Sequence, residues 1–241
     1  MSQTTMFVSS SDVEYEEYVS KSGDVRGISD YLSDVEGPQG FVISLPEHNV
    51  ITPHFHRVNQ FQILFPADGA LYRRTPIDDV LVHYADGYVT YGPISTSTAP
   101  MEYFTLRAIH DRFIAYMPED RDKLVRRGKR NLSGAVTSAL LASPGVQTIF
   151  EDHSDGLFAG VEHLEPGESS STIDPAVGCG QFHYVLSGSA VYEGSAYDFK
   201  SLLWVGPDDA PATVAAGSDG LVLLTLRFPV GSQVIDGVAA S

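Results

Sequence analysis

The chain has 241 residues, a formal net charge of −16 and one cysteine, Cys179. Such an acidic chain is poorly suited to nucleic acid, because DNA and RNA binding depends on Lys and Arg neutralising phosphates, so we expect no nucleic-acid partner. A single cysteine excludes an intrachain disulfide, and no signal peptide or long apolar stretch is present, so we expect a cytoplasmic protein without membrane contact.

The first half is expected to consist of short β-strands. Residues 1–22 are polar and acidic, and we expect them to form an N-terminal arm. Apolar runs of strand length then follow, separated by Gly, Pro, Asn and Asp. They span residues 41–45, 61–65, 80–84, 88–92 and 103–109. This spacing is typical of an antiparallel meander or jelly roll and predicts a first barrel over residues 23–118.

The strand pattern is interrupted at residues 119–144. The composition there is charged and then rich in Ala and Leu, which predicts one or two short helices near Gly128 and Gly134, in a linker between two domains. Six of the fifteen basic residues lie within residues 121–130. They form either a patch for an anion or a partner, or a solvated face that balances an acidic body.

The remainder, residues 145–241, is expected to form a second β domain. Its strand-length apolar runs span residues 146–150, 157–164, 181–186, 189–194, 201–206, 212–216 and 221–228. Four sequence landmarks recur in the same order in both halves, a Gly-Pro pair and a Thr-Leu-Arg triplet among them. Such an ordered recurrence predicts an internal duplication.

The segment from Pro53 to Gln62 contains the strongest candidate site. His54 and His56 lie two residues apart, so on a strand both imidazoles face the same side of the sheet. Neutral imidazoles are good ligands for Fe, Mn, Ni, Cu or Zn, and a donor from a neighbouring strand would complete an open site. The pattern therefore predicts a converging pair of histidines at a metal or small-ligand site.

This segment resembles the first motif of the cupin superfamily, in which His-x-His is followed four residues later by a Glu. Gln60 stands in the position of that Glu. Residues 87–98 resemble the second motif, and Thr98 then occupies the position of the family's third histidine ligand. The resemblance implies an all-β bicupin: two tandem jelly-roll barrels joined by a short, partly helical linker, assembled as a homodimer.

The resemblance also leads to the first functional hypothesis, a small-molecule enzyme in which His54, His56 and Gln60 hold a divalent metal. That metal, Fe, Mn, Ni, Cu or Zn, would coordinate an oxygenated substrate for oxygenase or lyase/isomerase chemistry. The catalytic candidates are His54, His56, His83 and Tyr91, and the substrate-binding candidates are Gln62, Tyr103 and Arg107. No nucleotide-binding fingerprint is present, so we expect no nucleotide cofactor.

Two alternatives use the same residues without a metal. One is a binding or sensor protein whose pocket is lined by His54, Gln60 and Gln62 and by aromatic side chains. The other is acid–base catalysis by His54 or His56, which predicts a pH–rate inflection near the ordinary imidazole pKa of about 6.5. In the second half the His-x-His positions fall near Pro175 and Val177, so we expect no metal ligands there.

Overall fold

The computed structural model describes residues 5–21, 23–125, 130–151 and 153–232. The regular structure in these ranges is almost all β-strand, which confirms the predicted all-β class. The helical elements among them are short: η1 (Ser10–Asp12), η2 (Arg121–Lys123), η3 (Pro175–Val177) and α1 (Ser138–Leu141). Within the same ranges, no helix has the length and apolar character needed to span a membrane.

The chain divides into two compact units. The N-terminal unit is Glu14–Ala135, and the C-terminal unit combines Val136–Gly231 with residues 5–13. A short stretch from the beginning of the chain is therefore part of the C-terminal unit.

Where residues 1–22 are described, they include two strands, in contrast to the predicted arm. β1 (Met6–Val8) pairs with β19 (Leu202–Val205), and β2 (Glu16–Val19) pairs with β3 (Val25–Leu32). Each strand covers a sheet edge whose backbone N–H and C=O groups would otherwise lack partners. Pairing of this kind depends on distant residues and leaves no pattern in the acidic segment itself.

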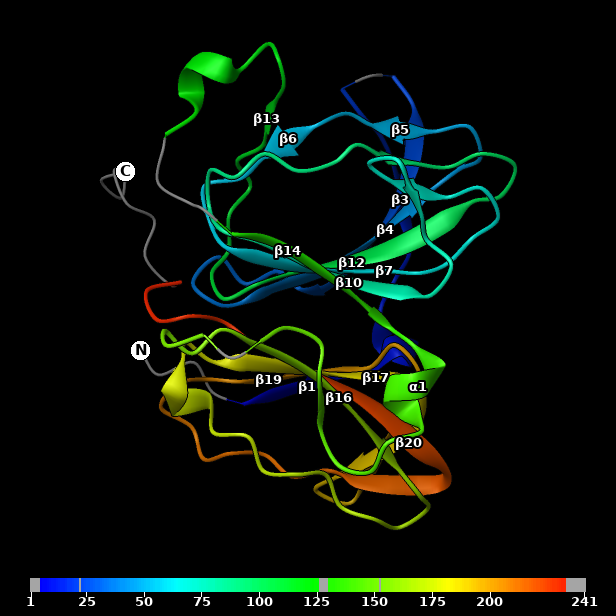
Figure 1. The fold of residues 1–241 in the computed structure, drawn as a ribbon, viewed down its shortest axis with the longest axis vertical. Coiled ribbons are helices and arrows are strands. Elements are labelled where there is room, and N and C mark those ends of the chain that lie inside the picture. The colour runs from blue at the N-terminus through cyan, green and yellow to red at the C-terminus, as the bar shows by residue number, and fades with distance from the viewer. Residues whose placement is uncertain (1–4, 22, 126–129, 152, 233–241) are drawn as a thin grey trace. The chain divides into compact units, whose positions relative to one another are not determined.

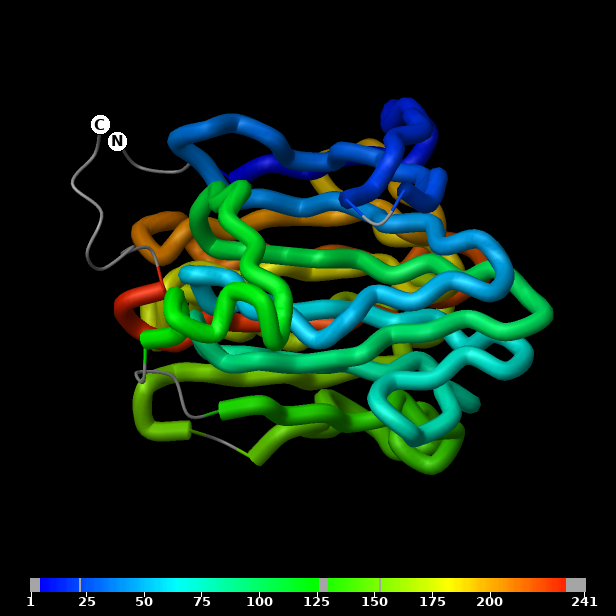
Figure 2. Tube along the Cα trace, turned by 90° about the horizontal axis from the view of Figure 1, so that it is seen from above, coloured from blue at the N-terminus to red at the C-terminus, as the bar shows by residue number. Residues whose placement is uncertain are grey.

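The N-terminal unit contains a seven-stranded antiparallel sheet in the order β14-β10-β7-β12-β4-β3-β2. The strands not yet bounded are β4 (Gln39–Leu45), β7 (Gln60–Leu64), β10 (Val80–Ala85), β12 (Met101–Arg107) and β14 (Asn131–Val136). Figure 2 shows strands distant in sequence side by side, with the green β12 between β4 and β7. Four of the five predicted apolar runs in this half are strands of this sheet.

Short strands form a second layer in the same unit (Figure 1). They are β5 (Val50–Ile51), β11 (Ile94–Ser95), β8 (Leu71–Tyr72) and β9 (Thr75–Pro76) in one sheet, and β6 (His54–Phe55) with β13 (Ala115–Tyr116) in another. Residues 88–92 are not the predicted strand, and Tyr91 forms only an isolated bridge with His54. Apolar side chains that include Ile43 and Leu64 form the buried core of this unit.

Within the predicted linker, residues 119–144, the described helical elements are η2 and α1. Gly134, expected near a helix, lies in strand β14, while residues 126–129 and with them Gly128 lie outside the described residues. Two of the clustered basic residues form ion pairs, Lys123 with Asp120 at 2.6 Å and Arg130 with Asp86 at 2.9 Å. These pairs favour the interpretation of this segment as a face that is balanced by local acidic groups.

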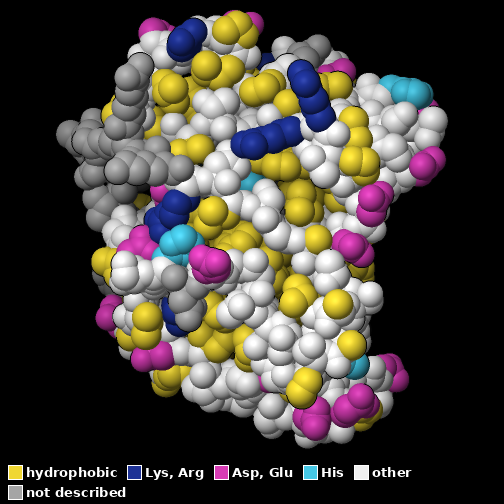
Figure 3. Space-filling model, in the orientation of Figure 1, with side chains coloured by type: hydrophobic (Ala, Val, Ile, Leu, Met, Phe, Trp, Pro, Cys, Tyr) yellow, Lys and Arg dark blue, Asp and Glu magenta, His cyan; other side chains and the backbone are white. Residues whose placement is uncertain are grey.

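The C-terminal unit contains a seven-stranded antiparallel sheet in the order β1-β19-β17-β20-β16-β15, with β18 paired to β17. The remaining bounds are β15 (Gln147–Thr148), β16 (Phe158–Leu164), β17 (Gln181–Tyr192), β18 (Ser195–Asp198) and β20 (Ala215–Arg227). Two predicted runs, 181–186 and 189–194, merge into the single long strand β17. On the face shown in Figure 3, hydrophobic side chains appear as separate yellow patches among polar ones.

Replacing Phe7 tests whether β1 stabilises the C-terminal unit. The Phe7 ring stacks on Tyr197 with 3.5 Å between ring centroids and packs against the core of that unit. We expect Phe7→Ala to lower the free energy of unfolding by about 2 kcal/mol, because a half-buried aromatic contact is lost. Urea unfolding measures the change, with Val230→Ala, a 67% exposed site in the same unit, as the control. Equal stability of the two variants would contradict this role of β1.

Candidate functional site

A cavity of about 230 Å³ lies inside the N-terminal unit. Its polar lining is dominated by arginine, histidine and tyrosine side chains: Arg26, Arg107, His54, His56, Tyr18, Tyr91, Tyr103 and Tyr116. Isoleucines and Phe41 supply the apolar part of the wall. No described Asp or Glu lines this cavity, so its charged groups are all cationic.

The two histidines of the motif converge on this cavity. His54 and His56 are 3% and 8% exposed, and their ring centroids lie 5.4 Å apart at an interplanar angle of 88°. Phe55 between them points the other way and packs near Tyr88 and Phe113. The period of two in a strand thus produces the predicted juxtaposition.

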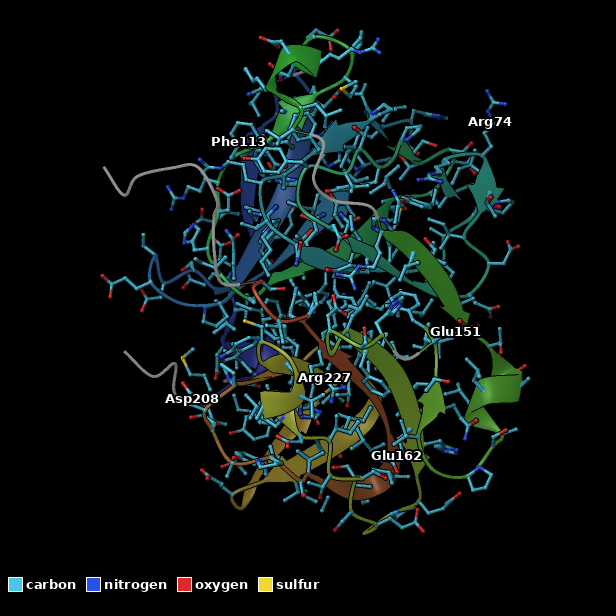
Figure 4. All side chains as sticks on the ribbon, turned by 60° about the vertical axis from the view of Figure 1, so that its left-hand side comes forward. Arg74, Phe113, Glu151, Glu162, Asp208 and Arg227 are labelled. Carbon is cyan, nitrogen blue, oxygen red and sulfur yellow. The ribbon has the colours of Figure 1, made fainter. Side chains whose placement is uncertain are left out.

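The protonation of both imidazoles is determined by their backbone partners. His54 Nδ1 donates to the carbonyl of Thr52 at 2.9 Å, and His56 Nδ1 donates at 2.6 Å to the carbonyl of Phe113, which is labelled in Figure 4. Because a carbonyl only accepts, each Nδ1 carries the proton and each Nε2 is an acceptor. Burial and then the nearby Arg107 lower the pKa of His54 to about 4 and that of His56 well below its usual value. Both rings are neutral at pH 7.

Arg107 lies against this pair with its guanidinium fully buried. Its Nη2 lies 3.0 Å from His56 Nδ1 and 3.3 Å from His56 Nε2, and it donates to Gln60 Oε1 at 3.2 Å. Its Nη1 donates to Gln39 Oε1 at 2.8 Å and to the backbone carbonyl of Asp111. All these acceptors are neutral, and Arg107 forms no ion pair with a described residue. The hydrogen bonds of the buried guanidinium are therefore all to neutral acceptors, and the nearby anion is the buried Asp111 carboxylate, which forms its own ion pair with Arg57.

The residues present do not fit a resident divalent metal. Gln60 uses its Oε1 for Arg107 and its Nε2 for the Tyr91 hydroxyl, and the Arg107 guanidinium lies against the His56 ring, with Nη2 3.3 Å from Nε2. Thr98, predicted by spacing at the third histidine position, is exposed and donates to Asp68 Oδ2 at 3.1 Å. Across the described ranges, no group of three or more His, Cys, Asp or Glu is placed to hold a metal ion. A permanent guanidinium charge at this point also repels a divalent cation.

The other predicted site residues fall into two groups. Gln62, Tyr91, Tyr103 and Arg107 line the cavity, as a ligand-binding role requires. His83 does not line it, because its Nδ1 lies 3.0 Å from Gln62 Oε1 and its Nε2 lies 2.9 Å from the Tyr72 hydroxyl. With both ring nitrogens engaged and the side chain fully buried, His83 supports the core beneath the cavity.

Sequence reasoning missed Arg26, Tyr18 and Tyr116. Arg26 on β3 is 5% exposed, and its Nε donates to Asn49 Oδ1 at 3.1 Å. The only sequence signal was its period-two spacing from Ile28, which places both side chains on the inner face of β3. Tyr18 belongs to the segment interpreted as an arm, and Tyr116 reaches the cavity only because β13 pairs with β6.

A larger depression, of about 600 Å³, lies in the C-terminal unit beside residues 141–145. Glu162, labelled in Figure 4, accepts from the backbone N–H and the hydroxyl of Ser171 at 2.8 and 2.7 Å. Glu168 accepts from the backbone N–H of Glu165 at 2.8 Å. Both carboxylates are engaged by nearby backbone and hydroxyl groups, so we place the candidate site in the N-terminal unit.

His183 of the C-terminal unit is a buried core residue. Its Nδ1 lies 3.0 Å from Thr225 Oγ1, and its Nε2 lies 3.0 Å from Gln181 Nε2. Burial lowers its pKa to about 4. Pro175 and Val177, at the positions corresponding to His-x-His, form the 3-10 helix η3.

Comparison with solved structures identifies similar folds at low sequence identity. A candidate dioxygenase from Nostoc punctiforme is 12% identical, with a TM-score of 0.68 over 97% of this chain and 86% of that chain. The bacterial pirin of Escherichia coli in complex with nickel(II) is 10% identical, with a TM-score of 0.58 over 94% of this chain and 100% of that chain. The oxalate decarboxylase of Bacillus subtilis, studied for its Mn(II) centres, is 11% identical, with a TM-score of 0.55 over 95% and 78%.

No protein-family model matches the sequence, and no curated protein matches it significantly. At identities this low the structural likenesses show the fold alone, which is a jelly roll of the cupin type. The function therefore has to be inferred from the residues of the cavity itself.

The buried neutral histidines predict that acid destabilises the fold. Burial lowers the pKa of His54 and His183 to about 4 and that of His83 to about 3. Between these values and the unfolded value of about 6.5 the unfolded chain binds more protons. The stability from these groups is thus present above pH 6.5 and is lost as the pH falls. Each group contributes up to about 1.4 kcal/mol per pH unit in that window.

Urea unfolding at pH 7, 6 and 5 measures this dependence. We expect His183→Asn to reduce the slope of the unfolding free energy against pH by up to about 1.4 kcal/mol per pH unit, which corresponds to one bound proton. His48→Asn, at an exposed position, is the matched control and should leave the slope unchanged. An unfolding free energy that does not change between pH 7 and 5 would contradict the assignment of neutral buried histidines.

Proposed function

We propose that the N-terminal unit binds a small organic carboxylate without a resident metal. The observation that carries this proposal is the buried guanidinium of Arg107, which contacts only neutral acceptors in a cavity that no described Asp or Glu lines. A buried charge is costly unless it is paired, and a guanidinium fits the two oxygens of a carboxylate. A bound carboxylate would bring an anion to the cavity side of Arg107, which the Asp111 carboxylate does not line, and would replace the 3.2–3.3 Å contacts of Nη2 with Gln60 and His56.

The size of the cavity and the part of its wall other than Arg107 favour a compact ligand with an apolar body. The cavity of about 230 Å³ is smaller than the range of about 300–1,000 Å³ typical of drug-sized ligands. Ile43, Ile51 and Ile114 offer apolar contact. Burial raises the pKa of Tyr103, so its hydroxyl stays protonated and available to donate, while His54 Nε2 is available to accept. A ligand hydroxyl or carbonyl near these groups would add directional contacts.

A cupin-type metalloenzyme is the second candidate, and one observation favours it. Both histidines have Nδ1 bonded to a backbone carbonyl, the arrangement that orients imidazoles with Nε2 toward a metal. Oxygenase or lyase/isomerase chemistry on an oxygenated substrate would then require Arg107 to move away from His56 Nε2. Acid–base catalysis by His54 would not give the inflection near 6.5, because burial lowers the pKa of that ring to about 4.

Carboxylate binding by the full chain tests the proposal. The probes are acetate, isobutyrate and benzoate with their uncharged amides, followed by calorimetry and thermal shift. We expect at least one carboxylate to bind, its amide to bind at least about tenfold more weakly, and Arg107→Met to remove the difference, because a charge-assisted hydrogen bond is lost. Arg74→Met, at an exposed position labelled in Figure 4, is the matched control.

Two outcomes would overturn the proposal. One is equal affinity for each carboxylate and its amide, or no binding of either. The other is an Arg107→Met protein that keeps its native melting transition and binds carboxylates as tightly as the Arg74→Met control.

A further inference from the structure

We propose that the ligand of this cavity is a small dicarboxylate, with one carboxylate at Arg107 and the other at Arg26. The inference rests on the proposed function and extends it, because it assigns the ligand two charged ends and a length. It starts from the positions of the two arginines in the sheet rather than from Arg107 alone.

The strand register places the two arginines at opposite ends of β4. Gly27 pairs with Ser44, so Arg26 lies at the Leu45 end of that strand, whereas Arg107 pairs with Gln39 at the other end. With the seven residues of β4 between these ends, the two backbones are about 20 Å apart along the strand, at about 3.3 Å per residue. The two arginines therefore approach the site from opposite directions.

Both side chains nevertheless line the same cavity, so the two cationic residues border one enclosed space. Two neighbouring cavities support this order. Arg107 and His56 also line a cavity of about 320 Å³, while Arg26 and Tyr116 also line a different cavity of about 400 Å³. Each arginine thus lies at one end of the central cavity, in a wall that the central cavity shares with a different neighbouring cavity.

The middle of the cavity suits a short carbon chain. Ile43 on β4 lies between the two ends of that strand and pairs with Tyr103, while Ile51 belongs to the wall at the Arg26 end. Burial is the largest cause of the lowered pKa of His54, and the positive charges of Arg107 and Arg26 lower it further. Both guanidinium charges therefore act on the same histidine. Two like charges facing one small cavity repel each other, and a dianion of matching length compensates both at once.

The contacts of Arg26 are compatible with this role. Its Nη2 donates to the carbonyl of Val50 at 3.2 Å and lies 3.4 Å from Asp24 Oδ2, on a side chain that is 42% exposed. An ion pair with such an exposed partner is weak. A ligand carboxylate inside the cavity would meet the same guanidinium in a drier environment, where the attraction is stronger.

The test is a calorimetric series with the full chain. The probes are the dicarboxylates from malonate to pimelate, each beside the monocarboxylate with the same number of carbons. We expect one chain length to bind at least about tenfold more tightly than its monocarboxylate partner, the gain typical of a second charge-assisted contact. Arg26→Met should bring that dicarboxylate down to the affinity of the monocarboxylate, and Arg26→Lys should retain part of the preference.

The control is Arg74→Met, which should keep the full preference, and circular dichroism with thermal melting checks that each variant is folded. Dicarboxylates that bind no more tightly than monocarboxylates at any length would overturn this inference and leave the proposed function standing. The absence of any carboxylate binding would overturn the proposed function as well. A folded Arg26→Met protein with an undiminished dicarboxylate preference would show that Arg26 does not bind the second carboxylate.

Discussion

The buried charge of Arg107 is the constraint on which the rest of the site depends. A guanidinium removed from water costs several kcal/mol unless its donors are satisfied, and here Gln39, Gln60, His56 and the carbonyl of Asp111 satisfy them. His56 has to remain neutral beside it, and burial together with Arg107 lowers the pKa of that ring. The glutamine at position 60 is consistent with the same constraint, because its amide accepts from Arg107 while donating to Tyr91.

Much of the fold follows from local pattern in the sequence. Apolar runs with strand length became β4, β7, β10 and β12, because their inner faces close over one core. Elements that depend on distant partners were not predictable in this way. β1 and β2 are strands because β19 and β3 pair with them, and residues 88–92 form no strand in spite of a strand-like composition.

In the candidate site, too, contacts within one strand were predictable and contacts between distant strands were not. The convergence of His54 and His56 was predictable because two residues on one strand share a face. Thr98 was misplaced because loop lengths, rather than the motif spacing, determine which residue meets His54, and that residue is Tyr91. Arg26 and Arg107 come from strands about 80 residues apart in sequence, so their shared cavity is visible only once β4 joins them. The internal duplication and the homodimer remain predictions.

The central claim is that the cation of this site is Arg107 and not a metal. The most direct test is elemental analysis of the untagged protein, purified without chelator, beside a His54→Ala/His56→Ala variant. The account predicts far less than one equivalent of Fe, Mn, Ni, Cu or Zn in either protein. Near-stoichiometric metal in the wild type that disappears in the variant would contradict it and would favour the cupin-type metalloenzyme.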